Sequence, residues 1–244
     1  MDVSKAKNVV IVLLLVFNIF LLANMLIFHS SQGVSKETLE NTRLILAQRG
    51  IKLECEIPSK PGGNSRLVYI KSELDEENIA GRLLGTKYEA SGDGSHFFSS
   101  NGKIEFTGID SFIYTAGTEA RAQDAVSVKE AEDAAMKFMK DKGLLTGKFV
   151  LDRSEENGDG SWTLDYIETY GGSLLFDNCF SVTVRGREVS RLEYRKHQFK
   201  GFSSENIEQF EAYQALLAHF KEKSDIVITS IDSGYKLEEP SMGD

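Results

Sequence analysis

The most constraining feature of the sequence is an apolar run from Val9 to Phe28, in which only Asn18 and Asn24 are polar and no residue is charged. A helix of this length spans about 30 Å, the thickness of a bilayer's hydrocarbon core. A cleavable signal peptide has a shorter apolar region, roughly 7–15 residues, followed by a small-residue cleavage site. The residues after Phe28 offer no such site. The run therefore predicts one uncleaved transmembrane helix at residues 9–28.

The charges beside this run favour one orientation. Lys5 and Lys7 precede it, whereas residues 29–35 contain no Lys or Arg. Positive charge is enriched in the cytoplasmic segments that flank a span. We therefore expect a single-pass protein of the cell membrane, with residues 1–8 in the cytoplasm and residues 29–244 outside. Lys36 and Arg43 follow soon afterwards, so the asymmetry is small.

The residues beyond the run are acidic. The whole chain has a formal net charge of −9, and residues 1–28 carry two lysines and one aspartate, which leaves −10 for the remainder. This excess of negative charge argues against a nucleic-acid partner and against adhesion to anionic lipid headgroups.

Two cysteines, Cys55 and Cys179, lie in separate apolar stretches that are typical of strands. A location outside the cytoplasm permits a disulfide, but two cysteines make no framework of bridges. Buried free thiols are the expected state, and a pairing between the two cysteines stays open.

Helices and short-linked strands alternate along residues 29–244, and the pattern occurs twice. The first half predicts a helix over residues 36–50, strands over 51–57 and 66–72, and a short helix from Asp75. It continues with a hairpin that turns at Asn101-Gly102 and a strand over 111–117. A polar connector over residues 118–126 separates the halves.

The second half predicts a helix whose capping box is Ser127 and Glu130. Strands follow between residues 148 and 194, then a helix over 203–225 and a last strand over 225–237. Short connections between strands exclude a parallel α/β sheet. The fold class is therefore α+β, with two related helix-plus-antiparallel-sheet units over residues 29–120 and 121–244.

No catalytic or cofactor-binding motif is recognisable. The four histidines (His29, His96, His197 and His219) lack metal-ligand spacing, and the sequence contains no serine-hydrolase, zinc-protease or P-loop motif. The stretch from Glu155 to Gly160 loosely resembles the start of a calcium loop. Tyr166 stands where such a loop needs a bidentate Glu, so a hairpin turn is expected instead. The sequence thus predicts no catalytic, cofactor or metal site and no enzyme.

Several stretches resemble one family. The opening residues 1–26, with the Asn18-Ile19-Phe20-Leu21 element inside the apolar run, resemble the start of the YycI (WalI) family. Residues 99–106, 166–184 and 233–239 add weaker matches, so that the resemblance covers most of the chain.

This resemblance implies a YycH/YycI-like fold and a role in Gram-positive bacteria. It implies a bitopic regulator of the essential YycG (WalK) sensor histidine kinase, in the YycFG (WalRK) two-component system that controls cell-wall metabolism. The partners it implies are that kinase and a YycH (WalH) protein, contacted through transmembrane helices and extracytoplasmic domains, without a cofactor. It leaves open whether the kinase is activated or inhibited.

The amide at the centre of the run is the candidate contact residue. An Asn at mid-bilayer is unsatisfied against lipid but can hydrogen-bond across a helix pair, although it can also bond to its own backbone. Asn24 lies about 120° around the helix from Asn18, so the two amides do not share one stripe. The expected partner-contact residues are Asn18, Phe17, Leu21, Leu22 and Met25.

Two other functional classes compete with this interpretation. One is an envelope binding module whose PepSY- or cystatin-like units hold a peptide, a protease or a wall fragment, because residues 127–144 are typical of the helix in such units. The other is an enzyme of envelope remodelling, which the missing nucleophile and base argue against.

Overall fold

The structure is a computed structural model of the 244-residue chain, and it describes residues 11–22, 24, 33–59, 65–70, 72–92, 94–117, 126–206 and 211–237. Contacts divide the chain into two compact units. The terminal unit combines Met1–Asn64 with Glu208–Ile231, and the sheet unit combines Ser65–Ile207 with Asp232–Asp244. This division differs from a boundary between residues 120 and 121, which falls outside the described residues.

The terminal unit brings together two segments that lie far apart in the sequence. Its elements are α2 (Lys36–Gln48), β1 (Ile51–Leu53), α5 (Ala212–His219) and β12 (Ile226–Ile228). Strands β1 and β12 pair in parallel, with Ile51 opposite Ile226. The Ser35 hydroxyl accepts a hydrogen bond from the Thr38 amide and so caps α2, as the sequence predicts. A small core is formed by Leu46, Ile51, Ile57 and Leu216.

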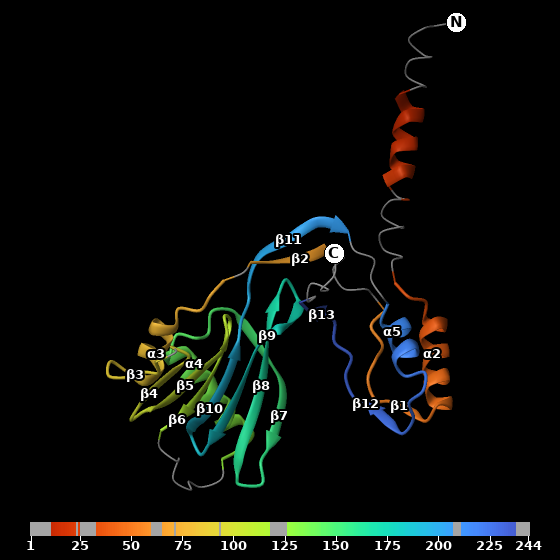
Figure 1. Cartoon of the computed structure of the whole chain (residues 1–244). Coiled ribbons are helices and arrows are strands. Elements are labelled where there is room, and N and C mark those ends of the chain that lie inside the picture. The colour runs from red at the N-terminus through yellow and green to blue at the C-terminus, as the bar shows by residue number, and fades with distance from the viewer. Residues whose placement is uncertain are drawn as a thin grey trace, which may run out of the picture. The chain divides into compact units, whose positions relative to one another are not determined.

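The sheet unit is built on one nine-stranded sheet, shown in Figure 1, with the strand order β3-β4-β5-β6-β10-β9-β8-β7 and β13 paired to β9. The first four strands are β3 (Glu89–Ala90), β4 (His96–Ser99), β5 (Gly102–Gly108) and β6 (Ser111–Ala116). The others are β7 (Lys148–Glu156), β8 (Ser161–Tyr170), β9 (Ser173–Arg185), β10 (Glu188–Arg195) and β13 (Gly234–Tyr235). A separate antiparallel pair consists of β2 (Ser65–Ile70) and β11 (Gln198–Asn206).

The large sheet consists of two four-stranded meanders joined at their last strands. Helix α3 (Glu76–Leu84) precedes β3–β6, and helix α4 (Val128–Asp141) precedes β7–β10. Strands β6 and β10 pair antiparallel, with Tyr114 opposite Leu192. The predicted α+β class is confirmed, and the predicted alternation of one helix with antiparallel strands occurs twice within a single sheet.

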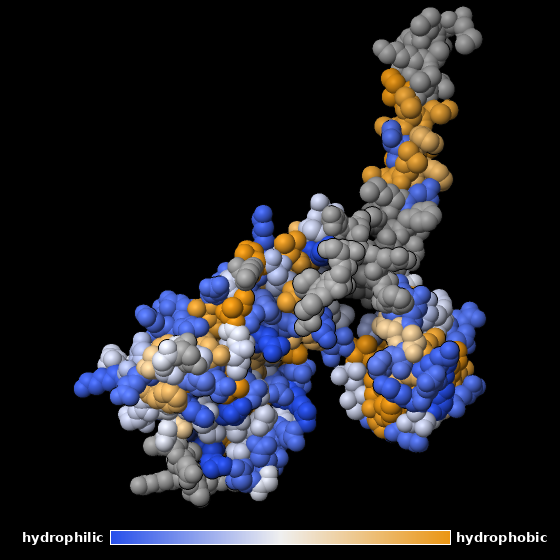
Figure 2. Space-filling view, in the orientation of Figure 1, coloured by the Kyte–Doolittle hydropathy of each residue, from blue (hydrophilic) through white to orange (hydrophobic). Residues whose placement is uncertain are grey.

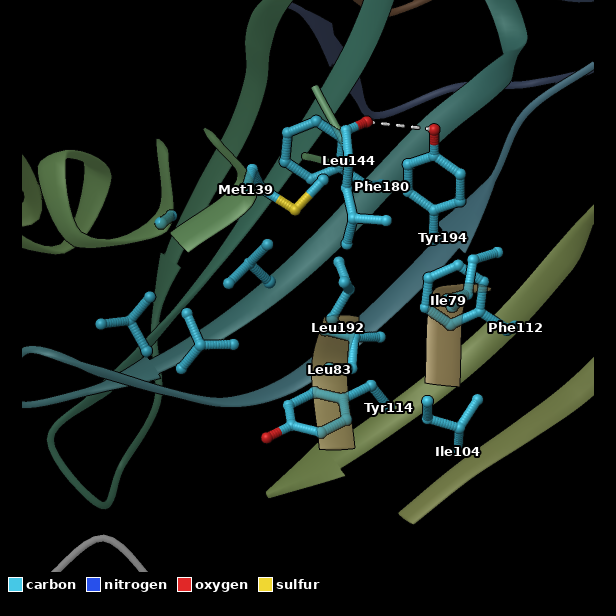
Figure 3. Close-up of a cluster of buried hydrophobic side chains, with 14 of the residues drawn as sticks. Ile79, Leu83, Ile104, Phe112, Tyr114, Met139, Leu144, Phe180, Leu192 and Tyr194 are labelled. Atoms are coloured by element: carbon cyan, nitrogen blue, oxygen red, sulfur yellow. Dashed lines mark hydrogen bonds between the residues drawn. The ribbon is translucent and has the colours of Figure 1, made fainter. Parts of the chain in front are cut away.

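Helices α3 and α4 cover one face of this sheet (Figure 1), and the main core lies between them and the strands. Figure 3 shows buried side chains of both meanders meeting there, including Phe112 and Leu192. The Tyr194 hydroxyl donates a hydrogen bond to the Leu144 carbonyl oxygen at 3.2 Å, which satisfies the polar end of a buried ring. Burial raises the pKa of Tyr194 to about 12.

The opposite face of the sheet, here called the open face, is polar. Along β9, the buried residues Phe180, Val182 and Val184 alternate with half-buried residues that point to the open face. These are Cys179, Ser181, Thr183 and Arg185.

Two predicted boundaries near the C-terminus are wrong. The helix predicted over residues 203–225 is shorter, because β11 continues to Asn206 in its pairing with β2 and α5 begins only at Ala212. The strand predicted over residues 225–237 is two strands, of which β12 pairs with β1 and β13 pairs with β9. Tertiary pairing decides both boundaries, and local periodicity carries no information about it.

The predicted hairpin at Asn101-Gly102 is confirmed, with Gly102 as the first residue of β5. The φ angle of Gly102 is 147°, and a Cβ atom on Gly102 would lie 2.3 Å from the Thr115 carbonyl oxygen. Glycine is needed here for close approach of β6 as much as for the turn.

Candidate functional site

The N-terminal helical segment is the candidate contact site. Residues 11–22 are helical, and all their side chains are exposed; Phe17 is 53% exposed and Leu22 63%. Figure 2 shows the apolar character of this segment. Among the described residues, no helix is both long enough and apolar enough to cross a membrane. Residues 9, 10, 23 and 25–28 of the predicted span lie outside the described part of the chain.

Four of the five candidate contact residues form one strip on this segment. Phe17 and Leu21 are one turn apart, and so are Asn18 and Leu22, so that the two pairs lie side by side. Met25, seven residues after Asn18, lies outside the described residues.

An uncovered apolar helix of this kind is unstable in water. Burying one Leu or Phe side chain contributes about 1.5–3 kcal/mol. An isolated helix shorter than roughly 12–15 residues is marginal in water by itself. The exposed apolar side chains of residues 11–22 therefore gain no burial from the rest of the described chain.

A buried polar network lies where β8, β9 and β10 meet. The Lys196 Nζ atom lies 2.9 Å from the Glu168 Oε1 atom, and the side chains are only 15% and 6% exposed. Asn178 donates to the Glu168 Oε2 atom at 2.7 Å and to the His197 carbonyl oxygen at 3.0 Å. The Asn178 Oδ1 atom accepts from the His197 amide at 2.9 Å. Each group is partnered by protein, so this network holds strands together and presents no free acid or base.

The histidines do not form a metal site among the described residues, where no cluster of three His, Cys, Asp or Glu side chains occurs. The His197 Nδ1 atom lies 2.6 Å from the Asp110 Oδ2 atom, which links the β5–β6 turn to the end of β10. His219 lies against Phe220. His29 lies outside the described residues.

The calcium-like stretch is a turn between β7 and β8, as expected from the sequence. The Asp159 carboxylate accepts hydrogen bonds from the Ser161 hydroxyl at 2.6 Å and from the Ser161 amide at 3.1 Å. It also forms an ion pair with Arg185. The Ser161 hydrogen bonds, with Arg185, lower the pKa of Asp159. The carboxylate is therefore used by the turn itself.

Both cysteines are free thiols and both are half-buried. The Cys55 thiol lies 3.7 Å from the Ile228 carbonyl oxygen in the terminal unit. Cys179 belongs to the open face of the sheet unit, where burial raises the pKa of its thiol above the ordinary value. A neutral thiol of this kind is a poor nucleophile.

Comparison with protein families gives one match. The family described as YycI protein matches residues 29–242. No curated protein matches the chain.

Two solved structures are similar to this chain. A crystal structure of YycH from Bacillus subtilis has a TM-score of 0.54 and 10% sequence identity, covering 76% of this chain and 50% of that one. This chain thus spans half the length of that structure, and the likeness supports a shared fold. The Bacillus megaterium YpeB C-terminal domain has a TM-score of 0.28 and 14% identity, covering 66% of this chain and 63% of that one, which is too weak to indicate a common fold.

Proposed function

Because the chain belongs to the YycI family, we propose that it is a membrane-anchored regulator of a sensor histidine kinase of the YycG (WalK) type, acting with a YycH-like protein. The family match over residues 29–242 is the observation that carries this proposal. The kinase belongs to a two-component system that controls cell-wall metabolism in Gram-positive bacteria.

The membrane anchor is the apolar run at residues 9–28. Its support is the length of the run, its lack of charge, and the exposure of every side chain from residue 11 to residue 22. Lys5 and Lys7 favour a cytoplasmic N-terminus. In this arrangement both units lie outside the cytoplasm, on the side of the membrane where the cell wall is found.

The regulatory contact is made by the strip of Phe17, Asn18, Leu21 and Leu22, together with Met25. Apolar side chains gain no hydrophobic stabilisation when two helices meet in lipid, since lipid tails already cover them. A hydrogen bond from the Asn18 amide to a polar group of the partner span is worth roughly 0.6–2 kcal/mol. Asn18 thus supplies the specificity that the apolar residues lack.

The partner outside the membrane is a YycH-like protein. The support is the match to the YycI family, for which the sequence resemblance implies a YycH partner. The likeness to the YycH structure adds a shared fold, and a shared fold by itself does not imply an interaction. Catalysis has no part in this proposal, which relies on contacts alone.

Replacement of the span tests this proposal. Residues 9–28 are exchanged for an unrelated apolar helix of equal length, and kinase output is measured with a reporter gene in a Gram-positive host. We expect output to change as it does when the whole protein is deleted, because the replacement removes the contact strip. Insertion and abundance are verified by protease accessibility of the outer units. Unchanged kinase output with a correctly inserted chain would mean that the span acts only as an anchor.

A further inference from the structure

The open face of the sheet unit contains a cavity of about 480 Å³. Ligand sites for small molecules are commonly about 300–1,000 Å³. Side chains from β6, β8, β9 and β10 line most of it. It lies on the face opposite α3 and α4, so it is not a defect of the main core.

Strand register arranges the polar lining in two rows. Glu193, Ser181 and Asp165 are directly opposite one another on β10, β9 and β8. The next row of the same face contains Arg195, Cys179 and Ile167. The cavity therefore carries charges of both signs at fixed positions on neighbouring strands.

Three charges of the cavity lining have no hydrogen-bond or ion-pair partner among the described residues. Glu193 of the cavity lining pairs with Arg191, and Arg153 pairs with Glu155. In contrast, Asp152, Asp165 and Arg195 make no side-chain hydrogen bond or ion pair with any described residue. Asp165 is half-buried, whereas Asp152 and Arg195 are exposed at the cavity.

Apolar side chains complete the lining. Ile113 and Ile167 lie on β6 and β8, and Phe176 comes from an irregular part of β9. Ile167 pairs with Cys179 but the next residue, Glu168, pairs with Leu175, so residues 176–178 are extra residues in β9. This bulge places Phe176, which is 37% exposed, against the cavity.

We propose that this cavity binds a short zwitterionic peptide with apolar side chains. Asp165 and Asp152 bind the terminal ammonium group, and Arg195 binds the terminal carboxylate, which its planar fork matches. Ile113, Ile167 and Phe176 contact the peptide's apolar side chains. This proposal concerns the sheet unit alone and does not depend on the contact strip of the N-terminal segment.

The spacing of the charges suits a peptide of about two residues. Asp165 on β8 and Arg195 on β10 are separated by two inter-strand distances across the sheet and by two residues along the strands. Their Cα atoms are therefore about 12 Å apart. An extended dipeptide spans roughly 7 Å. The long Arg195 side chain covers much of the remaining distance.

The test is isothermal titration calorimetry of the full chain in lipid nanodiscs with the dipeptide Leu-Leu. We expect saturable binding, and at least about tenfold weaker binding of N-acetyl-Leu-Leu and of Leu-Leu amide, because each lacks one charged end. Asp165→Asn should remove most of the discrimination against the acetylated peptide, and Arg195→Gln most of the discrimination against the amide. Asp141→Asn on α4 and Arg187→Gln in the β9–β10 turn change the charge equally outside the cavity, and should leave both preferences intact.

Chemical labelling of Cys179 provides a second readout, which does not depend on the heat of binding that calorimetry measures. In a Cys55→Ser chain, Leu-Leu should slow the reaction of Cys179 with N-ethylmaleimide, and Arg195→Gln should reduce this protection. No saturable binding at concentrations up to about 10 mM, well above the millimolar range of weak complexes, would overturn the proposal. Equal affinity for the free and capped peptides would overturn it as well.

Discussion

At the scale of single residues, the least expected feature is the buried ion pair between Glu168 and Lys196. In the sequence both look like ordinary strand charges, since nothing local distinguishes them from the exposed Glu155 or Lys200. In the structure the Glu168 carboxylate is satisfied on both oxygens, by Lys196 and by a hydrogen bond from Asn178, which is 0% exposed and lies on the next strand. A buried charge is tolerated only when such partners satisfy it.

Replacing Lys196 by Met should destabilise the sheet unit by about 3 kcal/mol, because it leaves the Glu168 carboxylate buried without its cation. Urea unfolding monitored by Trp162 measures this, since Trp162 is the single tryptophan and its indole N–H donates to the Val126 carbonyl oxygen. Lys200→Met, on an exposed position of β11, is the matched control and should change stability little. Equal effects of the two substitutions on the free energy of unfolding would show that the buried Glu168 carboxylate does not need the Lys196 ammonium group for its stability.

At the scale of elements, a local signal predicts the start of α4. Ser127 and Glu130 form the capping box of α4, with the Glu130 carboxylate accepting from the Ser127 amide at 3.1 Å. Arg187, in the β9–β10 turn, adds a hydrogen bond to Glu130 at 2.7 Å. The cap was readable from residue spacing, whereas the contact with Arg187 required knowledge of the sheet.

These contacts make the cap sensitive to acid. The hydrogen bond with Arg187, followed by those with Ser127, lowers the pKa of Glu130 below its ordinary value of 4.5 in the folded chain. A carboxyl whose pKa is lower in the folded chain stabilises the fold at any pH above its pKa in the unfolded chain. This contribution is lost as the pH falls through its pKa in the folded chain.

Glu130→Gln should therefore be less stable than the parent chain at pH 7, and the difference should shrink as the pH falls below 4.5. Urea unfolding at a series of pH values measures this. Glu188→Gln, an exposed position on β10, should give a difference that varies less with pH. A Glu130→Gln difference that is constant from pH 7 to pH 3 would contradict the assigned role of the carboxylate.

Element boundaries were less predictable at the C-terminus. Residues 203–206 have no pattern that separates a strand from a helix, and their pairing with β2 requires residues more than a hundred positions earlier. The same holds for the short strands β12 and β13, whose partners lie in different units. Residue patterns predicted a strand over residues 225–237 but not its division in two, and they predicted a helix where β11 ends.

At the scale of the whole molecule, the sequence predicts two contiguous units, and the contacts join residues 1–64 with residues 208–231 in one compact unit. Strand β1 pairs with β12, and α2 contacts α5, so that the terminal unit has no counterpart in any single stretch of sequence. The sheet unit does keep the expected repeat, one helix followed by four strands, twice over. Hydrophobic periodicity reports local elements, and long-range pairing adds information that periodicity lacks.

The candidate contact site was predicted from the sequence alone, because an amide inside a long apolar run is unusual by composition. The structure adds that Phe17, Asn18, Leu21 and Leu22 are helical and exposed together. The cavity on the open face had no such signal. Its charges come from β7, β8 and β10 and become neighbours only through the register of these strands and of β9 between them.

The central claim is that the N-terminal span recognises a partner span through Asn18. A bacterial membrane two-hybrid assay between this chain and a YycG-type kinase measures it directly, with Asn18→Leu compared with Asn24→Leu, the same change about 120° around the helix. We predict that Asn18→Leu weakens association about three- to thirtyfold, the equivalent of one lost interhelical hydrogen bond, while Asn24→Leu has little effect. Unchanged association for Asn18→Leu, at equal membrane abundance, would contradict the claim.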